Sequence, residues 1–135
     1  MTGNKTTKLH PSDRWLIALS AAAGMALLVI GIRFATVPNH AGRFFGLAPV
    51  PGPFDLHHVV ALRDIWIALL VIGLAALREW RALSLCLGLG ALVCLGDSVI
   101  VARSSGSVSA MIFHVASGLY CGGVALALWK HASRS

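Results

Sequence analysis

Five ionisable side chains lie within apolar stretches of the sequence: Arg33, Arg63, Asp64, Asp97 and His114. Even on the lenient insertion scale, a charge deep in a bilayer costs about 2.5 to 3.5 kcal/mol, so such residues are usually functional. A carboxyl group can donate or accept a proton, an arginine can stabilise developing negative charge, and a histidine exchanges protons near neutral pH. We therefore take these five residues as candidate catalytic residues.

The charges of this set balance. Two arginines and two aspartates sum to zero, which leaves His114 free to gain or lose a proton. An arginine beside a carboxylate favours its ionised form, whereas burial favours the neutral form, so the sequence leaves open which aspartate is the acid and which is the base. A structural role is the alternative, because a buried ion network can fix the register of helices without catalysing anything.

The surrounding sequence indicates a membrane protein. Of its 135 residues, 57% are apolar and 12% are charged, against about 25% charged in soluble chains, which excludes a soluble enzyme and a disordered tail. A membrane-spanning helix needs about 20 apolar residues, and residues 15–37, 59–77, 82–102 and 108–129 each provide that length. No stretch alternates like a barrel strand. We predict an all-α integral membrane four-helix bundle.

The five candidate residues share a depth. At 1.5 Å per residue, all of them lie roughly 6 to 10 Å from the same membrane boundary. Each continues a helical row of residues three or four apart. The rows are Arg33 with Val29, Ala26 and Ala22; Asp64 with Ala68, Val71 and Ala75; Asp97 with Cys94, Gly90 and Cys86; and His114 with Ser117 or Gly118, Cys121 and Ala125. Because small residues allow close helix packing, we expect the polar groups to point into the seam between helices.

Lysine and arginine predict the orientation. Those at one side are Lys5, Lys8, Arg14, Arg78, Arg81, Lys130 and Arg134, whereas the other side has Arg43 and Arg103. The positive-inside rule therefore places both termini in the cytoplasm, with basic tails 1–14 and 130–135 flanking one membrane domain, 15–129. The net charge of +6 reflects this topology, so we expect no nucleic-acid partner. The protein is predicted to be multi-pass, in the inner membrane if it is bacterial.

A Pro-rich outer loop, residues 38–58, joins the first two predicted spans and contains four of the five prolines. Loops of this length are often lids or binding segments, although a stiff connector is an equal alternative. Its apolar segment 41–47 is expected to lie in the outer membrane interface.

The sequence predicts no cofactor and no metal. It lacks C-x-x-C and Gly-rich phosphate-binding motifs, and only one histidine, His114, is expected to face inward, whereas haem ligation would use two. A surface metal site on His40, His57, His58 and Asp55 is the weaker alternative.

The order of short motifs is similar to a known family. Gly31-Ile32-Arg33-Phe34, Arg63-Asp64, Gly96-Asp97 and His114 resemble the pattern of a family of small four-span membrane proteins of unknown function, itself distantly similar to the DoxX-type four-helix bundles. The resemblance covers residues 20–128. It implies the fold and the matching polar positions, and it brings no activity.

Three functions fit these residues. The first is acid–base catalysis on a lipophilic small molecule: one of Asp64 and Asp97 donates a proton while the other activates water or removes a proton. The residue types resemble the Asp-Arg-Asp arrangement of small soluble epoxide hydrolases, and epoxide hydrolysis, isomerisation or cyclisation would suit them. The alternatives are a non-catalytic accessory or scaffold subunit and, less favoured, a small proton-coupled carrier. The expected partners are the lipid bilayer and a lipophilic ligand, and the sequence is compatible with a homo-oligomer.

Overall fold

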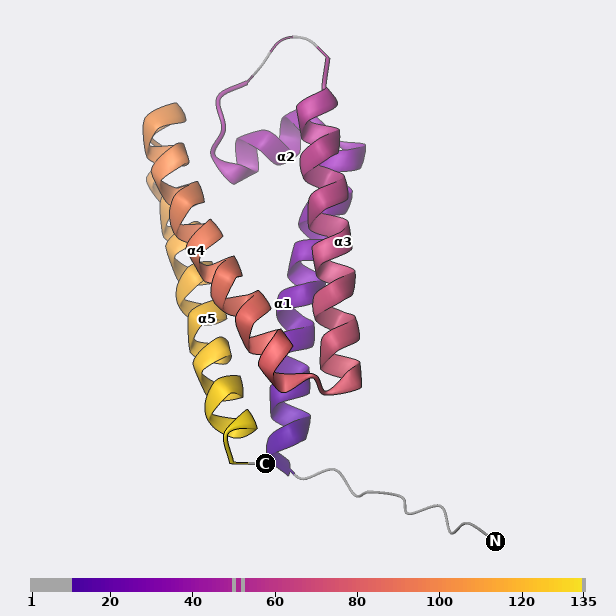
Figure 1. Cartoon of the computed structure of the whole chain (residues 1–135). Helices are drawn as coiled ribbons and strands as arrows, with labels where there is room; N and C mark the ends of the chain where they lie inside the picture. The colour runs from indigo at the N-terminus through magenta and orange to yellow at the C-terminus, as the bar shows by residue number, and fades with distance from the viewer. Residues whose placement is uncertain (1–10, 50, 52, 135) are drawn as a thin grey trace, which may run out of the picture.

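The computed structural model describes residues 11–49, 51 and 53–134, so Lys5 and Lys8 of the predicted basic tail lie outside the described residues. This part of the chain is helical and contains no strand. The helices are α1 (Pro11–Thr36), α2 (Pro38–Phe45), α3 (Asp55–Leu77), α4 (Trp80–Ser104) and α5 (Val108–Ala132) (Figure 1). All except α2 are long and apolar enough to cross a membrane, which confirms the predicted all-α four-span bundle.

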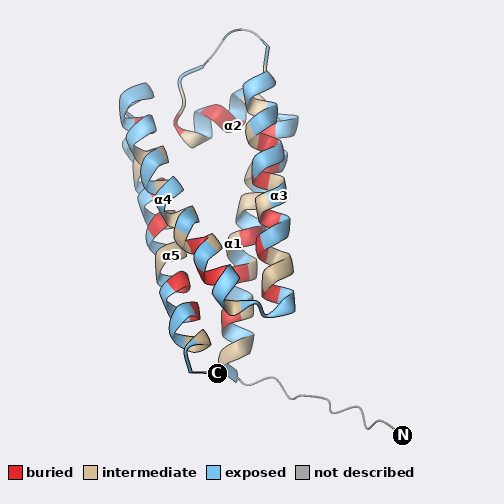
Figure 2. Ribbon diagram, viewed as in Figure 1, coloured by how far each residue is buried: buried red, intermediate tan, exposed pale blue. Residues whose placement is uncertain are grey.

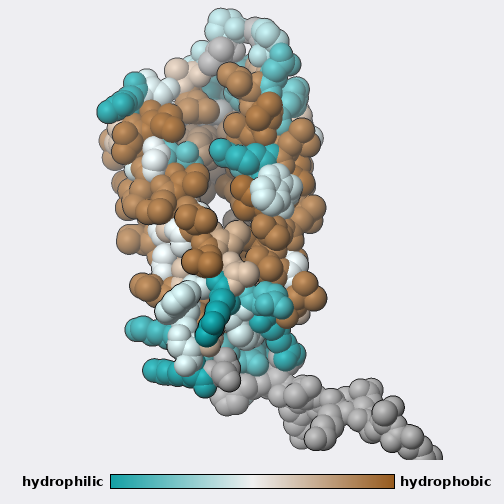
Figure 3. Space-filling model, in the orientation of Figure 1, coloured by the Kyte–Doolittle hydropathy of each residue, from teal (hydrophilic) through white to brown (hydrophobic). Residues whose placement is uncertain are grey.

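The surface of the four long helices is apolar. Leu62, Leu85 and Leu119 are each more than 60% exposed. In the ribbon coloured by burial, much of each long helix is exposed (Figure 2). In the space-filling view, brown apolar side chains cover the middle of the molecule and hydrophilic ones gather toward its two ends (Figure 3). An apolar surface of this extent would cause aggregation in water, whereas it is the surface that a membrane helix presents to lipid. The chain is therefore a multi-pass integral membrane protein.

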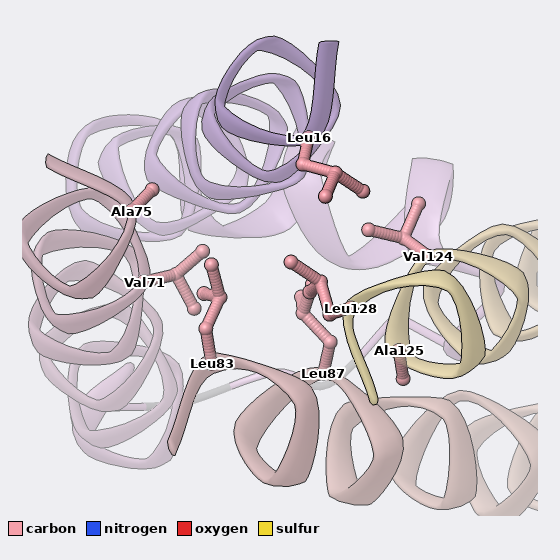
Figure 4. Packing of buried hydrophobic residues seen from close by; sticks show 8 residues of the cluster. All are labelled: Leu16, Val71, Ala75, Leu83, Leu87, Val124, Ala125 and Leu128. Carbon is pink, nitrogen blue, oxygen red and sulfur yellow. The ribbon is translucent and has the colours of Figure 1, made fainter. Parts of the chain in front are cut away.

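The long helices form two pairs, α1 with α3 and α4 with α5. The pairs converge toward the α3–α4 turn and separate toward α2 (Figure 1). Where they converge, one apolar cluster joins all four helices through Leu16, Val71, Ala75, Leu83, Leu87, Val124, Ala125 and Leu128 (Figure 4). The larger apolar cluster therefore lies in the half of the bundle that contains the described ends of the chain.

Small residues bring α1 and α3 close together. A Cβ atom on Gly24 would lie 3.2 Å from the carbonyl oxygen of Ala68, and one on Gly31 would lie 3.0 Å from that of Ala61. The buried residues of α3 follow alternating spacings of three and four, as in a coiled-coil seam: Ala61, Asp64, Ala68, Val71 and Ala75. Asp64 thus occupies a core position among small apolar residues.

Helix α2 replaces the first part of the predicted Pro-rich loop. Pro38 suits the first helical turn because its backbone angle is already helical and its missing N–H is not needed there. The helix ends at Gly46, whose φ of 92° is the left-handed conformation common after a helix. It lies across the ends of the long helices rather than along them (Figure 1).

The described ends of the chain lie together beside the α3–α4 turn (Figure 1). There, His131 Nε2 on α5 is 3.1 Å from Asp13 Oδ1 on α1, and the His131 ring contacts Trp80 of α4 edge-on. These contacts tie three helices together at one end. The shared side of the termini agrees with the predicted orientation, and their cytoplasmic location remains a prediction.

Candidate functional site

Arg63 and Asp64 form an ion pair on α3. Nε and Nη2 of Arg63 each lie 3.0 Å from Oδ1 of Asp64. The Asp64 side chain is only 4% exposed, whereas that of Arg63 is 47% exposed, so the guanidinium group extends from the buried carboxylate toward the surface. Nη1 of Arg63 has no partner among the described residues. The pair neutralises the buried carboxylate and still leaves three N–H donors of Arg63 free, two on Nη1 and one on Nη2.

His114 on α5 is buried and connects to α2. Its Nε2 lies 3.0 Å from the carbonyl oxygen of Phe45, and the two rings meet edge-on with centroids 4.3 Å apart. A carbonyl oxygen only accepts, so Nε2 carries the hydrogen and the neutral imidazole has its lone pair on Nδ1. The same bond satisfies a carbonyl that the last turn of α2 leaves unpaired.

The C-terminal end of α2 is fixed to α4 and the α4–α5 turn by further contacts. Ser105 Oγ donates to the Gly46 carbonyl at 2.6 Å, and the Ala48 N–H donates to Ser104 Oγ at 3.1 Å. Gly46 is buried, and a Cβ atom there would lie 2.7 Å from Val101 Cγ1. Because α2 begins directly after α1, it bridges the two helix pairs and covers the space between them at this end (Figure 1).

Asp97 on α4 faces the same space. It is half-buried and has no hydrogen bond or ion pair within the described part of the chain. It interacts electrostatically with His114 of α5 and with Arg63 and Asp64 of α3. The structure therefore brings together Arg63, Asp64, Asp97 and His114 from three helices, beneath a fourth.

The space between the pairs is not filled by side chains. Gly90 lies two turns before Asp97 on the same face of α4, and a Cβ atom there would meet nothing within 4 Å. Figure 3 shows the surface hollowed between the two helix pairs, with a hydrophilic patch inside the brown surface at this level. In the described part of the chain, Ser20 Oγ is the single buried side-chain oxygen or nitrogen without a partner. The unpaired carboxylate oxygens of Asp64 and Asp97 are therefore accessible to a water-sized molecule.

Arg33 does not face inward, and the prediction that it points into the seam is wrong. It lies on the exposed side of α1, with its guanidinium carbon 5.8 Å from the centre of the Phe44 ring. That ring in turn contacts Phe113 of α5. Apolar residues occur all around α1, so its pattern does not reveal which side packs; the close approach of Gly24 and Gly31 to α3 decides the orientation.

Sequence reasoning missed two contributors, the Phe45 carbonyl and Ser105. A backbone carbonyl has no side-chain signature, and nothing in the Ser-Ser-Gly-Ser run of residues 104–107 indicates which serine binds α2. Gly46, following two phenylalanines, is a helix-ending signal that could have revealed α2. Within residues 11–49, 51 and 53–134, no three metal-ligating side chains are grouped, and His57 instead packs against Phe34 and Phe54.

Comparison with known proteins identifies the family. No curated protein and no solved structure matches the chain. Residues 24–128 match a family described as a domain of unknown function, DUF4267. This range contains all five residues proposed from the sequence, together with α2 and the complete spans of α3 and α4. The chain therefore belongs to the DUF4267 family, a small four-span membrane protein family of unknown function.

Proposed function

We propose that Arg63, Asp64, Asp97 and His114 form an intramembrane acid–base site that acts on a lipophilic small molecule from the outer leaflet. The observation that carries this proposal is the orientation of His114: the Phe45 carbonyl holds Nε2–H and leaves Nδ1 as the proton-exchanging atom. A base whose ring is fixed by a third group is the common arrangement of proton-transfer sites. Asp97, on the neighbouring helix α4, is the carboxylate that lies within electrostatic range of His114.

The charges of the four residues support one mobile proton. Arg63 balances Asp64, and Asp97 has no ion pair among the described residues. One proton held by either Asp97 or His114 makes the set neutral, which the low dielectric of a membrane favours. Asp97 and His114 are therefore the pair that exchanges this proton, and Asp64 positions Arg63.

The proposed reaction follows from these roles. Ionised Asp97 accepts a proton from water as the water oxygen attacks an epoxide carbon, and the ring C–O bond breaks. The free Nη1 of Arg63 stabilises the negative charge that develops on the epoxide oxygen, and protonated His114 then donates a proton to it. The proton on Asp97 passes back to His114. In an isomerisation, Asp97 instead removes a proton from a C–H beside a carbonyl, Arg63 stabilises the negative charge on the enolate oxygen, and protonated Asp97 returns the proton to another carbon of the enolate. Arg33 is not in this set because it lies with Phe44.

Isotope incorporation tests this proposal without a known substrate. The purified protein in liposomes is incubated with long-chain epoxides in ¹⁸O-water and with long-chain ketones or enones in deuterated water. Mass spectrometry then follows ¹⁸O in the diol and deuterium beside the carbonyl. We expect catalysed incorporation for one of these classes and its loss in Asp64→Asn and Asp97→Asn. Unchanged turnover in both variants would overturn the proposal.

We also propose that both termini are cytoplasmic, and that a bacterial cell would carry the protein in its inner membrane. Within the described residues, the end with the termini has Arg14, Arg78, Arg81, Lys130 and Arg134. Single cysteines at Arg81 and Arg103, on opposite ends, test this in intact cells: an impermeant thiol reagent should label only the cysteine at position 103. Labelling only of the cysteine at position 81 would show that the orientation is the opposite, with both termini outside.

A non-catalytic accessory subunit is the second candidate. A shallow apolar groove of about 820 Å³ lies on the outer face of α4 and α5, with Gly88, Gly118 and Gly122 in its lining. Small residues in such a groove suit a helix of another membrane protein. This function predicts that Gly122→Leu releases a co-purifying membrane protein, while Asp97→Asn does not.

A further inference from the structure

We propose that the ligand of this site is an uncharged amphiphile that reaches it sideways from the outer leaflet, through an opening between α3 and α4 below α2. This inference rests on the proposed function, because it assumes that the polar site holds a ligand. It adds the ligand's route and chemical class.

Helix α2 closes the route from the outer end. The Phe45 carbonyl, the Gly46 carbonyl and the Ala48 N–H are all hydrogen-bonded to α4, α5 or the turn between them. Gly46 is also packed directly against the side chain of Val101. Moving α2 away would break three hydrogen bonds and expose this packing, so water-side access is obstructed.

The side between α3 and α4 is open instead. These helices are joined by the cluster of Val71, Ala75 and Leu83 near their turn, and they separate toward α2 (Figure 1). Above that cluster, Arg63 of α3 is half exposed and Asp97 of α4 is half-buried. The space around Gly90 is empty, and the hollow in Figure 3 lies between the two pairs. The polar site is therefore reachable from the lipid-facing side.

The surroundings of the opening define the ligand. Leu62 and Trp66 on α3 and Val93 on α4 are each more than half exposed, so a molecule approaching here is dissolved in lipid. An anionic head group would meet Asp97, which has no ion pair in the described part, and a cationic one would meet Arg63. A hydroxyl, carbonyl or epoxide can instead accept from Arg63 Nη1 and interact with Asp97 at no net charge. The best fit is an uncharged head group on an apolar chain.

Photolabelling in bilayers tests the route. The probe is a long-chain alcohol with a diazirine beside its hydroxyl, because the carbene formed on illumination reacts with any nearby side chain. We expect inner adducts, on the inward-facing residues Asp64 and Asp97, and we expect excess unlabelled alcohol to suppress them. Adducts at lipid-facing Leu119 should not be suppressed, because they report labelling by probe dissolved in the bulk bilayer. Adducts confined to lipid-facing positions would overturn the proposal.

Locking α2 distinguishes the side route from the outer one. Ala48 N and Ser104 Oγ are 3.1 Å apart, so we use the pair Ala48→Cys/Ser104→Cys, with the native cysteines replaced by alanine, and first verify that oxidation forms the disulfide. Sideways access predicts that the inner adducts persist after oxidation. Their loss on oxidation and return on reduction would show that the ligand passes beneath a moving α2.

Two glycine-to-phenylalanine variants, one inside the space between the helix pairs and one outside it, provide a matched comparison. Gly90→Phe adds a ring where a Cβ atom would meet no other helix or side chain within 4 Å, so it should fill part of the space and lower the inner adducts several-fold. Gly123→Phe adds the same ring at an exposed glycine of α5 and should leave them unchanged. Equal inner labelling in the two variants would overturn the proposal. These results do not depend on turnover, so binding without isotope incorporation would reject the proposed reaction alone.

Discussion

The imidazole of His114 and the backbone carbonyl of Phe45, 69 residues apart in sequence, lie 3.0 Å apart and connect α5 to α2. This contact joins the covering helix to a residue of the polar site. It orients the imidazole and, at the same time, satisfies a helix-end carbonyl. The position of α2 and the geometry of the site are therefore coupled.

Replacing His114 should loosen α2. His114→Phe keeps an aromatic ring but removes the donor, and an unpaired carbonyl costs about 1 to 3 kcal/mol. Hydrogen exchange of the amides in residues 41–45 should accelerate, with a smaller effect on α3. Ser133→Ala removes an exposed bond to the Trp129 carbonyl at the other end of the molecule and serves as the control. Unchanged exchange in α2 would show that His114 does not hold it.

The two members of the Arg63–Asp64 pair should differ in their effect on stability. Arg63→Met leaves a carboxylate unpaired at a core position, where breaking a buried pair typically costs about 3 to 5 kcal/mol. Asp64→Asn leaves a half-exposed arginine and an amide oxygen that can still accept its hydrogen bond, so we expect about 1 kcal/mol. The free energy of unfolding in detergent measures both. Equal losses would contradict the asymmetric burial of the pair.

Gly46 should be far less replaceable than Gly106. Both have positive φ angles, 92° and 66°, so alanine costs about 1 to 2 kcal/mol of backbone strain at either position. At Gly46 the added methyl also overlaps Val101 and Ala110, which should add about 1 to 3 kcal/mol, whereas it meets nothing at Gly106. Thermal unfolding in detergent should rank Gly46→Ala well below Gly106→Ala. Similar melting temperatures would argue against the docking of α2.

The close packing of α1 on α3 gives a further comparison. In Gly31→Ala, the new methyl would lie 3.0 Å from a backbone carbonyl that cannot move aside, so we expect a loss of about 1 to 3 kcal/mol. In Gly73→Ala, the methyl meets nothing within 4 Å, and helix propensity should make this variant about as stable as the wild type or slightly more so. Unfolding in detergent checks both, and an equally stable Gly31→Ala would show that the helices are farther apart.

Much of the architecture was predictable from hydropathy. The four spans follow from length alone, the row containing Asp64 on α3 is buried as expected, and the row containing His114 on α5 is buried except for the half-buried Cys121. The burial of these rows could be predicted because, in each row, a polar residue follows small residues on the same helix face, and small residues are typical of helix–helix interfaces in membranes. The row of Asp97 is half-buried, consistent with its position beside an open space.

The remaining features were not encoded in local patterns. The row of residues that predicts an inward-facing Arg33 is not buried in α1. Apolar residues lie on every side of this membrane helix, so its sequence does not indicate which side packs against the other helices. Helix α2 was not predicted because its proline and glycines are typical of a loop. Its length of eight residues is also too short for a helical periodicity to be recognised. Its docking depends on backbone groups of Phe45, Gly46 and Ala48, which any sequence would carry.

In the proposed reaction Asp97 transfers a proton, and isotope incorporation measures this transfer. The comparison is between Asp97→Asn and Asp55→Asn, which removes an exposed carboxylate from the start of α3, outside the site. Since general acid–base groups typically contribute about 10² to 10⁴ in rate, we expect Asp97→Asn to lower ¹⁸O or deuterium incorporation at least about 100-fold and Asp55→Asn to leave it unchanged. Equal incorporation in the two variants would contradict the proposed reaction.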